Sequence, residues 1–89
     1  MAGRHFTAQF DPGTGTLALL GALEPAHWLV IRDEVDRAFR RTAVKLVIDL
    51  SRADRVPSAT LGRLVHLCNT RYPGTFVRMP ARPYVPALA

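Results

Sequence analysis

Apolar and polar residues alternate near the N-terminus, and this pattern predicts a strand followed by a hairpin turn. Residues 5–10 alternate with a period of two, which is typical of a half-buried strand. The apolar residues that share one side of this segment are Phe6, Ala8 and Phe10. Residues 11–15 are dense in turn formers, and residues 16–20 are again mostly apolar. Two strands joined by such a short, glycine-containing connection predict a β-hairpin.

Two longer segments have the periodicity of amphipathic helices. From Pro25 onward, apolar residues recur at spacings of three and four, and proline suits the first helical position because its missing N–H costs nothing there. The apolar stripe consists of Trp28, Ile31, Val35, Ala38 and Phe39. A second helical pattern opens at Ser58, a residue type that favours the helix N-cap, and stops at Pro73. Its expected inward residues are Leu61, Leu64, Val65, Leu67 or Cys68, and Tyr72.

Two short apolar segments complete the predicted sheet. Residues 45–50 are almost continuously apolar, which is typical of a central strand covered on both faces. Residues 51–57 are predicted to be a polar loop, and residues 75–79 a fourth strand that Pro80 stops. This order of elements predicts an α/β fold with a mixed, mostly parallel sheet, an N-terminal hairpin and helices packed on the sheet. The second helix should begin at the carboxyl edge of the central strand, where open α/β sheets usually place their functional surface.

Length and composition set limits on the class of protein. The chain has 89 residues, of which 48% are hydrophobic and 21% charged, so we expect one globular domain over residues 1–80. Residues 81–89 contain two prolines and are expected to form a tail. Since no apolar run approaches the ~20 residues that cross a bilayer, we expect no membrane span. The N-terminus lacks a secretory profile, which favours the cytoplasm.

The chemistry-bearing residues do not predict an enzyme, a metal site or a cofactor. Twelve basic residues outnumber seven acidic ones, which gives a net charge of +5. The basic residues are scattered along the chain, and no aromatic residues interleave with them. This favours a solvated surface without a nucleic-acid partner. One cysteine and three separated histidines offer no metal-ligand spacing. His66 is expected about two turns down the second helix, on or beside its packed face with Cys68, too far from Ser58 to serve as its base.

Two short motifs stand at the end of the predicted central strand and the start of the second helix. Asp49-Leu50-Ser51 closes the strand, and after six residues the segment Ser58-Ala59-Thr60-Leu61-Gly62 opens the helix. These motifs resemble the Asp-Leu-Ser and Asp-Ser-Ser-Gly-Leu-Gly of the STAS domain, the module of bacterial anti-sigma-factor antagonists and of sulfate-transporter tails. Upstream, residues 21–24 (Gly-Ala-Leu-Glu) resemble the family's Gly-Glu-Leu-Asp. The resemblance covers residues 6–79 and implies a STAS-like fold whose later elements are missing, with residues 81–89 as a remnant of a third helix.

The resemblance implies a regulatory module that binds an anti-sigma factor with serine kinase activity. The kinase would phosphorylate Ser58, or as a second candidate Thr60, and a phosphatase of the PP2C type would reverse the modification. The implied partner-binding residues are Asp49, Arg52, Asp54, Arg55, Ser58, Leu61 and Gly62.

The chain also departs from the family's motif, and these departures leave a second hypothesis open. Pro57 replaces the Asp before the phosphoacceptor, Ala59 replaces the second Ser, and Thr60 replaces the Gly. A phosphorylation-silent STAS subunit of a larger stress-signalling or transport assembly would fit them. In either case, missing C-terminal elements would leave one flank of the sheet under-covered, which favours self-association or docking of residues 81–89 on a second chain.

Overall fold

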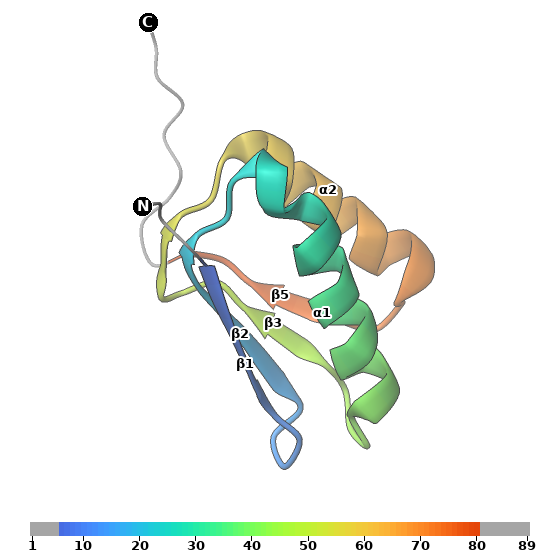
Figure 1. Cartoon of the computed structure of the whole chain (residues 1–89). Coiled ribbons are helices and arrows are strands. Elements are labelled where there is room, and N and C mark those ends of the chain that lie inside the picture. Colours follow the sequence, from blue (N-terminus) through green and yellow to red (C-terminus); the bar gives the residue numbers. More distant parts are fainter. Residues whose placement is uncertain (1–5, 81–89) are drawn as a thin grey trace, which may run out of the picture.

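The chain builds a mixed β-sheet and lays two α-helices against one of its faces (Figure 1). This computed structural model describes residues 6–80. The strands are β1 (Phe6–Asp11), β2 (Thr16–Ala22), β3 (Val47–Asp49), β4 (Ala53–Arg55) and β5 (Phe76–Arg78). The helices are the 3₁₀ turn η1 (Pro25–His27), α1 (Trp28–Arg41) and α2 (Ser58–Arg71). The predicted tail over residues 81–89, and His5 of the first predicted strand, lie outside the described residues.

The sheet has the strand order β1-β2-β3-β5, with β4 attached to β2. β1 and β2 are antiparallel, whereas β2 with β3, β2 with β4, and β3 with β5 are parallel. The α/β class, the mixed and mostly parallel sheet and the N-terminal hairpin are therefore confirmed. Among the described helices, none is long and apolar enough to span a membrane.

The hairpin between β1 and β2 closes through hydrogen bonds to the backbone and the side chain of Asp11. The Gly15 N–H donates to the Asp11 carbonyl oxygen at 2.9 Å, and the Gly13 N–H donates to the Asp11 carboxylate at 2.9 Å. Gly15 has a φ of 71°, in the left-handed region that glycine enters without strain. Its carbonyl oxygen also accepts the Val47 N–H at 2.8 Å, so the turn is tied to the start of β3.

Helix α1 follows the predicted amphipathic pattern, with one exception at its end. Pro25 occupies the start of η1, and Ile31, Val35 and Ala38 are buried in the core. Phe39 was expected to face inward with them, but 37% of it is exposed. Its ring lies 4.7 Å from that of Tyr72 at the rim of the helix pair, so the expectation for Phe39 was wrong: it packs sideways on α2 and not into the sheet.

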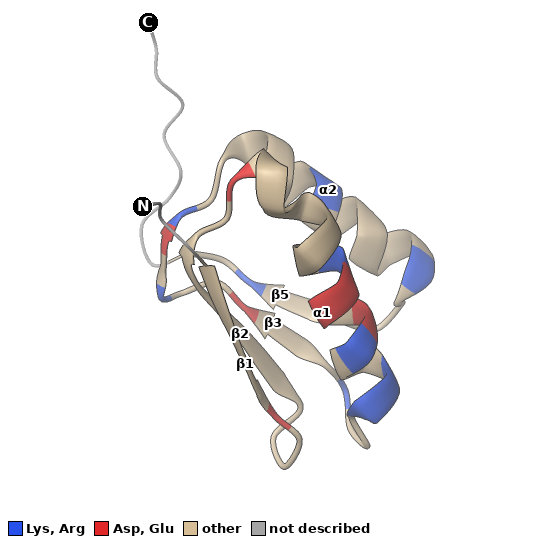
Figure 2. Cartoon of the chain, in the orientation of Figure 1, with Lys and Arg blue, Asp and Glu red and all other residues tan. Residues whose placement is uncertain are grey.

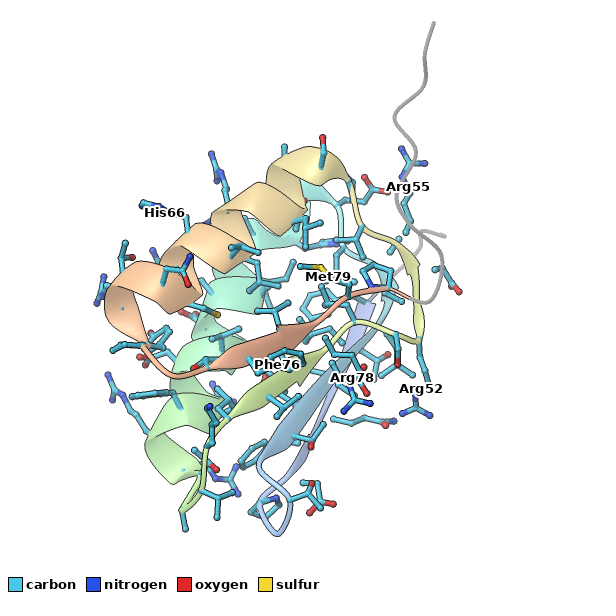
Figure 3. The ribbon with its side chains drawn as sticks, turned by 180° about the vertical axis from the view of Figure 1, so that it is seen from behind. Arg52, Arg55, His66, Phe76, Arg78 and Met79 are labelled. Atoms are coloured by element: carbon cyan, nitrogen blue, oxygen red, sulfur yellow. The ribbon has the colours of Figure 1, made fainter. Side chains whose placement is uncertain are left out.

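The core lies between the sheet and the two helices. Its buried members from the strands and the loops next to them include Leu17, Leu19, Leu23, Leu46, Ile48, Leu50 and Val56. Those from the α2 segment are Leu64, Leu67, Cys68 and Tyr72, of which the helical periodicity predicted Leu64, Tyr72 and one of Leu67 and Cys68. His66, by contrast, is exposed and points away from the sheet, so its predicted place at the packed face was wrong (Figure 3).

The prediction that β3 is covered on both faces was also wrong. Leu46, Ile48 and Leu50 are buried beneath the helices, whereas Val47 and Asp49 alternate with them and are only half-buried. The cause is that α1 and α2 pack on the same face of the sheet (Figure 1). No described helix covers the other face, which Figure 3 shows from the front, and we call it the open face.

Candidate functional site

The loop that joins β3 to α2 was predicted to carry the functional surface, and the structure holds most of its backbone against the sheet. The Leu50 N–H donates to the Arg78 carbonyl oxygen at 2.9 Å, and the Leu23 N–H donates to the Arg55 carbonyl oxygen at 2.9 Å. Residues 53–55 form strand β4 beside β2, so the expectation of an irregular loop over residues 51–57 was wrong in this part. The buried side chain of Val56 anchors the segment just before α2.

Asp49 closes the end of β3 and faces the open side of the sheet. Its carboxylate accepts the Ser51 N–H at 2.9 Å, which turns the chain after the strand. Partial burial tends to raise the pKa of Asp49, but the hydrogen bonds with Ser51 and the charges of Arg78 and Arg52 outweigh it, so this pKa lies below its ordinary value. Asp49 is thus a charged group that shapes the turn and balances two arginines.

The two arginines of the loop reach in different directions. Arg52 donates to the side-chain oxygen of Gln9 on β1 at 3.4 Å, which carries it to the open face. Arg55 forms an ion pair with Glu24, just before η1, at 3.3 Å. Figure 3 labels both side chains, and Asp54 between them is exposed. The structure therefore divides the predicted partner-binding residues: Asp49 and Arg52 belong with the open face, and Arg55 belongs with the start of the helices.

Helix α2 begins without a side-chain cap. Pro57 is its N-cap, with extended backbone angles (φ −56°, ψ 148°), and the Pro57 carbonyl oxygen accepts the Leu61 N–H at 2.9 Å. Ser58 was expected to be the cap, but it is the first helical residue, and no cap hydrogen bond reaches its side chain. Ser58 is exposed at the uncapped N-terminus, where first-turn N–H groups have no intrahelical partner.

Thr60, the second candidate phosphoacceptor, is buried in the structure. Only 1% of the residue is exposed, and its hydroxyl has no hydrogen-bond partner among the described residues. A kinase needs the hydroxyl at the surface, so the burial of Thr60 argues against it as a phosphoacceptor. The helical geometry explains the difference, because Thr60 lies one turn before Leu64 and shares the face that packs on the sheet.

Leu61 and Gly62 complete the set of predicted partner-binding residues. Leu61 is half-buried and packs against the core, so only part of it is available to a partner. Gly62 is exposed, and a Cβ atom built on it would meet no atom within 4 Å. Nothing in the fold therefore requires glycine at this position.

We expect Gly62→Ala to stabilise the protein. Alanine in an exposed helix interior is favoured over glycine by about 0.5–1 kcal/mol, and the space around Gly62 is open. Thermal unfolding followed by circular dichroism should show a rise in Tm of roughly 2–6 °C. An unchanged or lower Tm would show that α2 is strained or differently placed at this residue.

Sequence reasoning missed two residues that the tertiary structure adds to the site. Gln9 accepts the hydrogen bond from Arg52, and Arg78 lies beside Asp49 across the β3–β5 pair. The signal for Gln9 was the period-two alternation of residues 5–10, which places it on the polar side of its strand. Residues 75–79 do not alternate in polarity, so their pattern did not single out Arg78. Neither segment alone showed that Gln9 and Arg78 lie on one face of the sheet.

Other chemistry is sparse in the described residues. No group of three His, Cys, Asp or Glu side chains there could hold a metal ion. Cys68 is buried, and burial raises the pKa of its thiol to about 11, which makes it a poor nucleophile. Lys and Arg are spread over both helices, the β3–α2 loop and β5, with Asp and Glu among them (Figure 2).

Comparison with known proteins does not assign the chain: no family model, no curated protein and no solved structure matches it.

Proposed function

We propose that this protein is a regulatory binding module with a STAS-like fold, which docks on an anti-sigma factor with serine kinase activity. The observation that carries the proposal is Ser58, an exposed serine at the first position of an uncapped helix. The motif resemblance supports the same reading, as does the place of this helix start after the carboxyl end of β3. The docking surface is formed by Arg55, Ser58 and Gly62, with the exposed Asp54 and part of Leu61.

Phosphorylation of Ser58 would act on the partner and leave the fold intact. A phosphate adds roughly two negative charges, and a helix N-terminus accepts anions because its first N–H groups are unpaired and its dipole is positive there. Arg55 lies three residues away, in an exposed ion pair with Glu24 that a phosphate can compete for. The partner, in contrast, would meet new bulk and a reversed local charge. A PP2C-type phosphatase would restore the binding-competent form.

The serine content of the chain allows a matched test of the phosphoacceptor. Ser51 and Ser58 are the only serines in the sequence. We expect incubation with ATP and the anti-sigma kinases of the source genome to add one phosphate to the wild type and to Ser51→Ala, and none to Ser58→Ala. Intact mass spectrometry measures this directly. Phosphate on Ser58→Ala, or none on any form, would overturn the switch.

Binding and stability should respond separately to substitution at Ser58. We expect Ser58→Asp to weaken partner binding at least tenfold, about 1.4 kcal/mol, by titration calorimetry. Its Tm should stay within a few degrees of wild type or rise slightly, since a carboxylate in the first helical turn is favourable. Ser58→Ala should bind like wild type and lose little stability, because the Ser58 side chain forms no cap hydrogen bond. Equal binding by wild type and Ser58→Asp would contradict the proposal.

A phosphorylation-silent structural subunit is the second candidate. The burial of Thr60 favours it, because it removes one of the two hydroxyls that the motif offered to a kinase. Pro57 and Ala59 in place of the family's polar residues point the same way. In that case the protein would co-purify with a larger assembly, and Ser58→Asp would remain in it.

A further inference from the structure

The two outer edges of the sheet differ in how their side chains are covered. On β1, the Phe6 ring lies 5.5 Å from that of His27, and the Arg41 guanidinium lies 5.6 Å from the centre of the Phe10 ring. At the β5 edge, 55% of Phe76 and 51% of Met79 are exposed (Figure 3). Native proteins usually protect sheet edges, so the exposed apolar side chains around β5 indicate a contact surface.

The backbone of β5 also offers hydrogen-bonding groups at this edge. The Phe76 N–H donates to the Leu46 carbonyl oxygen at 3.0 Å, and the Arg78 carbonyl oxygen accepts the Leu50 N–H. Backbone groups along a strand point alternately to its two sides, so Val77, between these residues, turns its N–H and C=O to the free edge. No described strand pairs with that edge.

The side chains on the open face of β5 are an aromatic ring and a cation, two residues apart. Phe76 is the register partner of Val47, and Arg78 is the register partner of Asp49. If another β5 is placed antiparallel with Val77 opposite Val77, Phe76 of each strand faces Arg78 of the other. This is a non-hydrogen-bonded pair, in which side chains approach most closely.

We propose that two copies of this chain pair antiparallel through β5 and form one continuous sheet. The occupant is a second copy because the edge is self-complementary: the two-fold axis at Val77 brings an Arg78 guanidinium to a Phe76 ring twice, a favourable cation–π arrangement. The adjacent Asp49 already offsets part of the positive charge of Arg78, which lowers the repulsion between the two joined faces. β5 has three residues, so the dimer is weak and concentration-dependent. This pairing does not depend on the Ser58 switch.

Two substitutions of opposite charge at Phe76 test the proposed strand pairing. We expect sedimentation equilibrium of the full chain to show self-association that Phe76→Arg weakens about tenfold or more, because it sets Arg against Arg78 of the second copy. Phe76→Glu should associate within about threefold of wild type, because it sets Glu against the same arginine. Leu29→Arg, at a 62% exposed leucine on α1, should leave the association unchanged. Circular dichroism should show all variants folded.

The outcomes separate the proposed register from other contacts. If Phe76→Arg and Phe76→Glu weaken self-association equally, Phe76 acts only through non-specific apolar contact. The proposal would then be wrong. A monomeric wild type at millimolar concentration would also overturn it, as would loss of association in Leu29→Arg. A strand from another protein as the true occupant would appear as a monomeric wild type.

Cross-linking provides a direct measurement of the register. We expect mixed Phe76→Cys and Arg78→Cys proteins to form a disulfide-linked dimer on mild oxidation, faster than either variant alone, because only the antiparallel register brings positions 76 and 78 together. The native Cys68 should not compete, since it is buried and the pKa of its thiol is raised to about 11. Equal cross-linking in the mixture and in the single variants would exclude this register.

Discussion

Ile48→Asp is expected to unfold the protein, whereas the same substitution at the neighbouring Val47 should leave it folded. Ile48 is fully buried beneath the helices, and a carboxylate there has neither water nor a partner. Such burial costs several kcal/mol, about as much as the whole net stability of a small domain. Val47 faces the open side of the sheet and is half-buried, so an aspartate there keeps its contact with water. Its expected cost is about 1–2 kcal/mol.

Circular dichroism and chemical denaturation measure this difference. Ile48→Asp should lack a cooperative transition at 25 °C, and Val47→Asp should retain one with a lowered midpoint. If both variants unfold, the second face of β3 is covered as well, and the open face does not exist in solution. A normal melt for Ile48→Asp would show that β3 is not a core strand.

Among Gly15, Gly62 and Gly74, substitution by alanine should be most damaging at Gly15. Gly15 has a φ of 71°, and a Cβ on it would lie 2.6 Å from Cγ2 of Val44 and 2.7 Å from the carbonyl oxygen of Lys45. The left-handed conformation alone costs about 1–2 kcal/mol for a residue with a side chain. The backbone oxygen can move only if the hydrogen bond from Val47 to Gly15 is disturbed as well. We expect a total loss of about 3–4 kcal/mol.

Two other glycines serve as controls that separate the cost of backbone strain from the cost of a steric clash. Gly74 has a φ of 90° but open space around its Cβ position, so Gly74→Ala tests strain without a clash and should cost about 1–2 kcal/mol. Gly62→Ala involves neither strain nor a clash and should stabilise. Denaturant midpoints should rank Gly62→Ala above wild type, then Gly74→Ala, then Gly15→Ala. If Gly15→Ala is as stable as Gly74→Ala, the contact between the hairpin turn and the α1–β3 connection is looser than described.

Local patterns predicted the elements whose burial follows a single period. The alternation of Phe6, Ala8 and Phe10 placed them toward the core, and the three-and-four spacing of Ile31 and Val35 placed α1 on the sheet. The first residue of α2 was harder to predict from the sequence. Pro57 rather than Ser58 is the cap, because the extended backbone of Pro57 lets its carbonyl oxygen accept the first helical hydrogen bond, and residue preference does not report that geometry.

The sequence by itself determined the α/β class, the hairpin and most of the inward residues of both helices, because each depends on periodicity within one segment. Only the tertiary structure decided that both helices cover the same face of the sheet, which leaves Val47 and Asp49 on an open face. It also brought Arg52 of the β3–α2 loop to Gln9 on β1. These outcomes depend on where a segment lies relative to segments distant in the chain, and a pattern within one segment carries no such information.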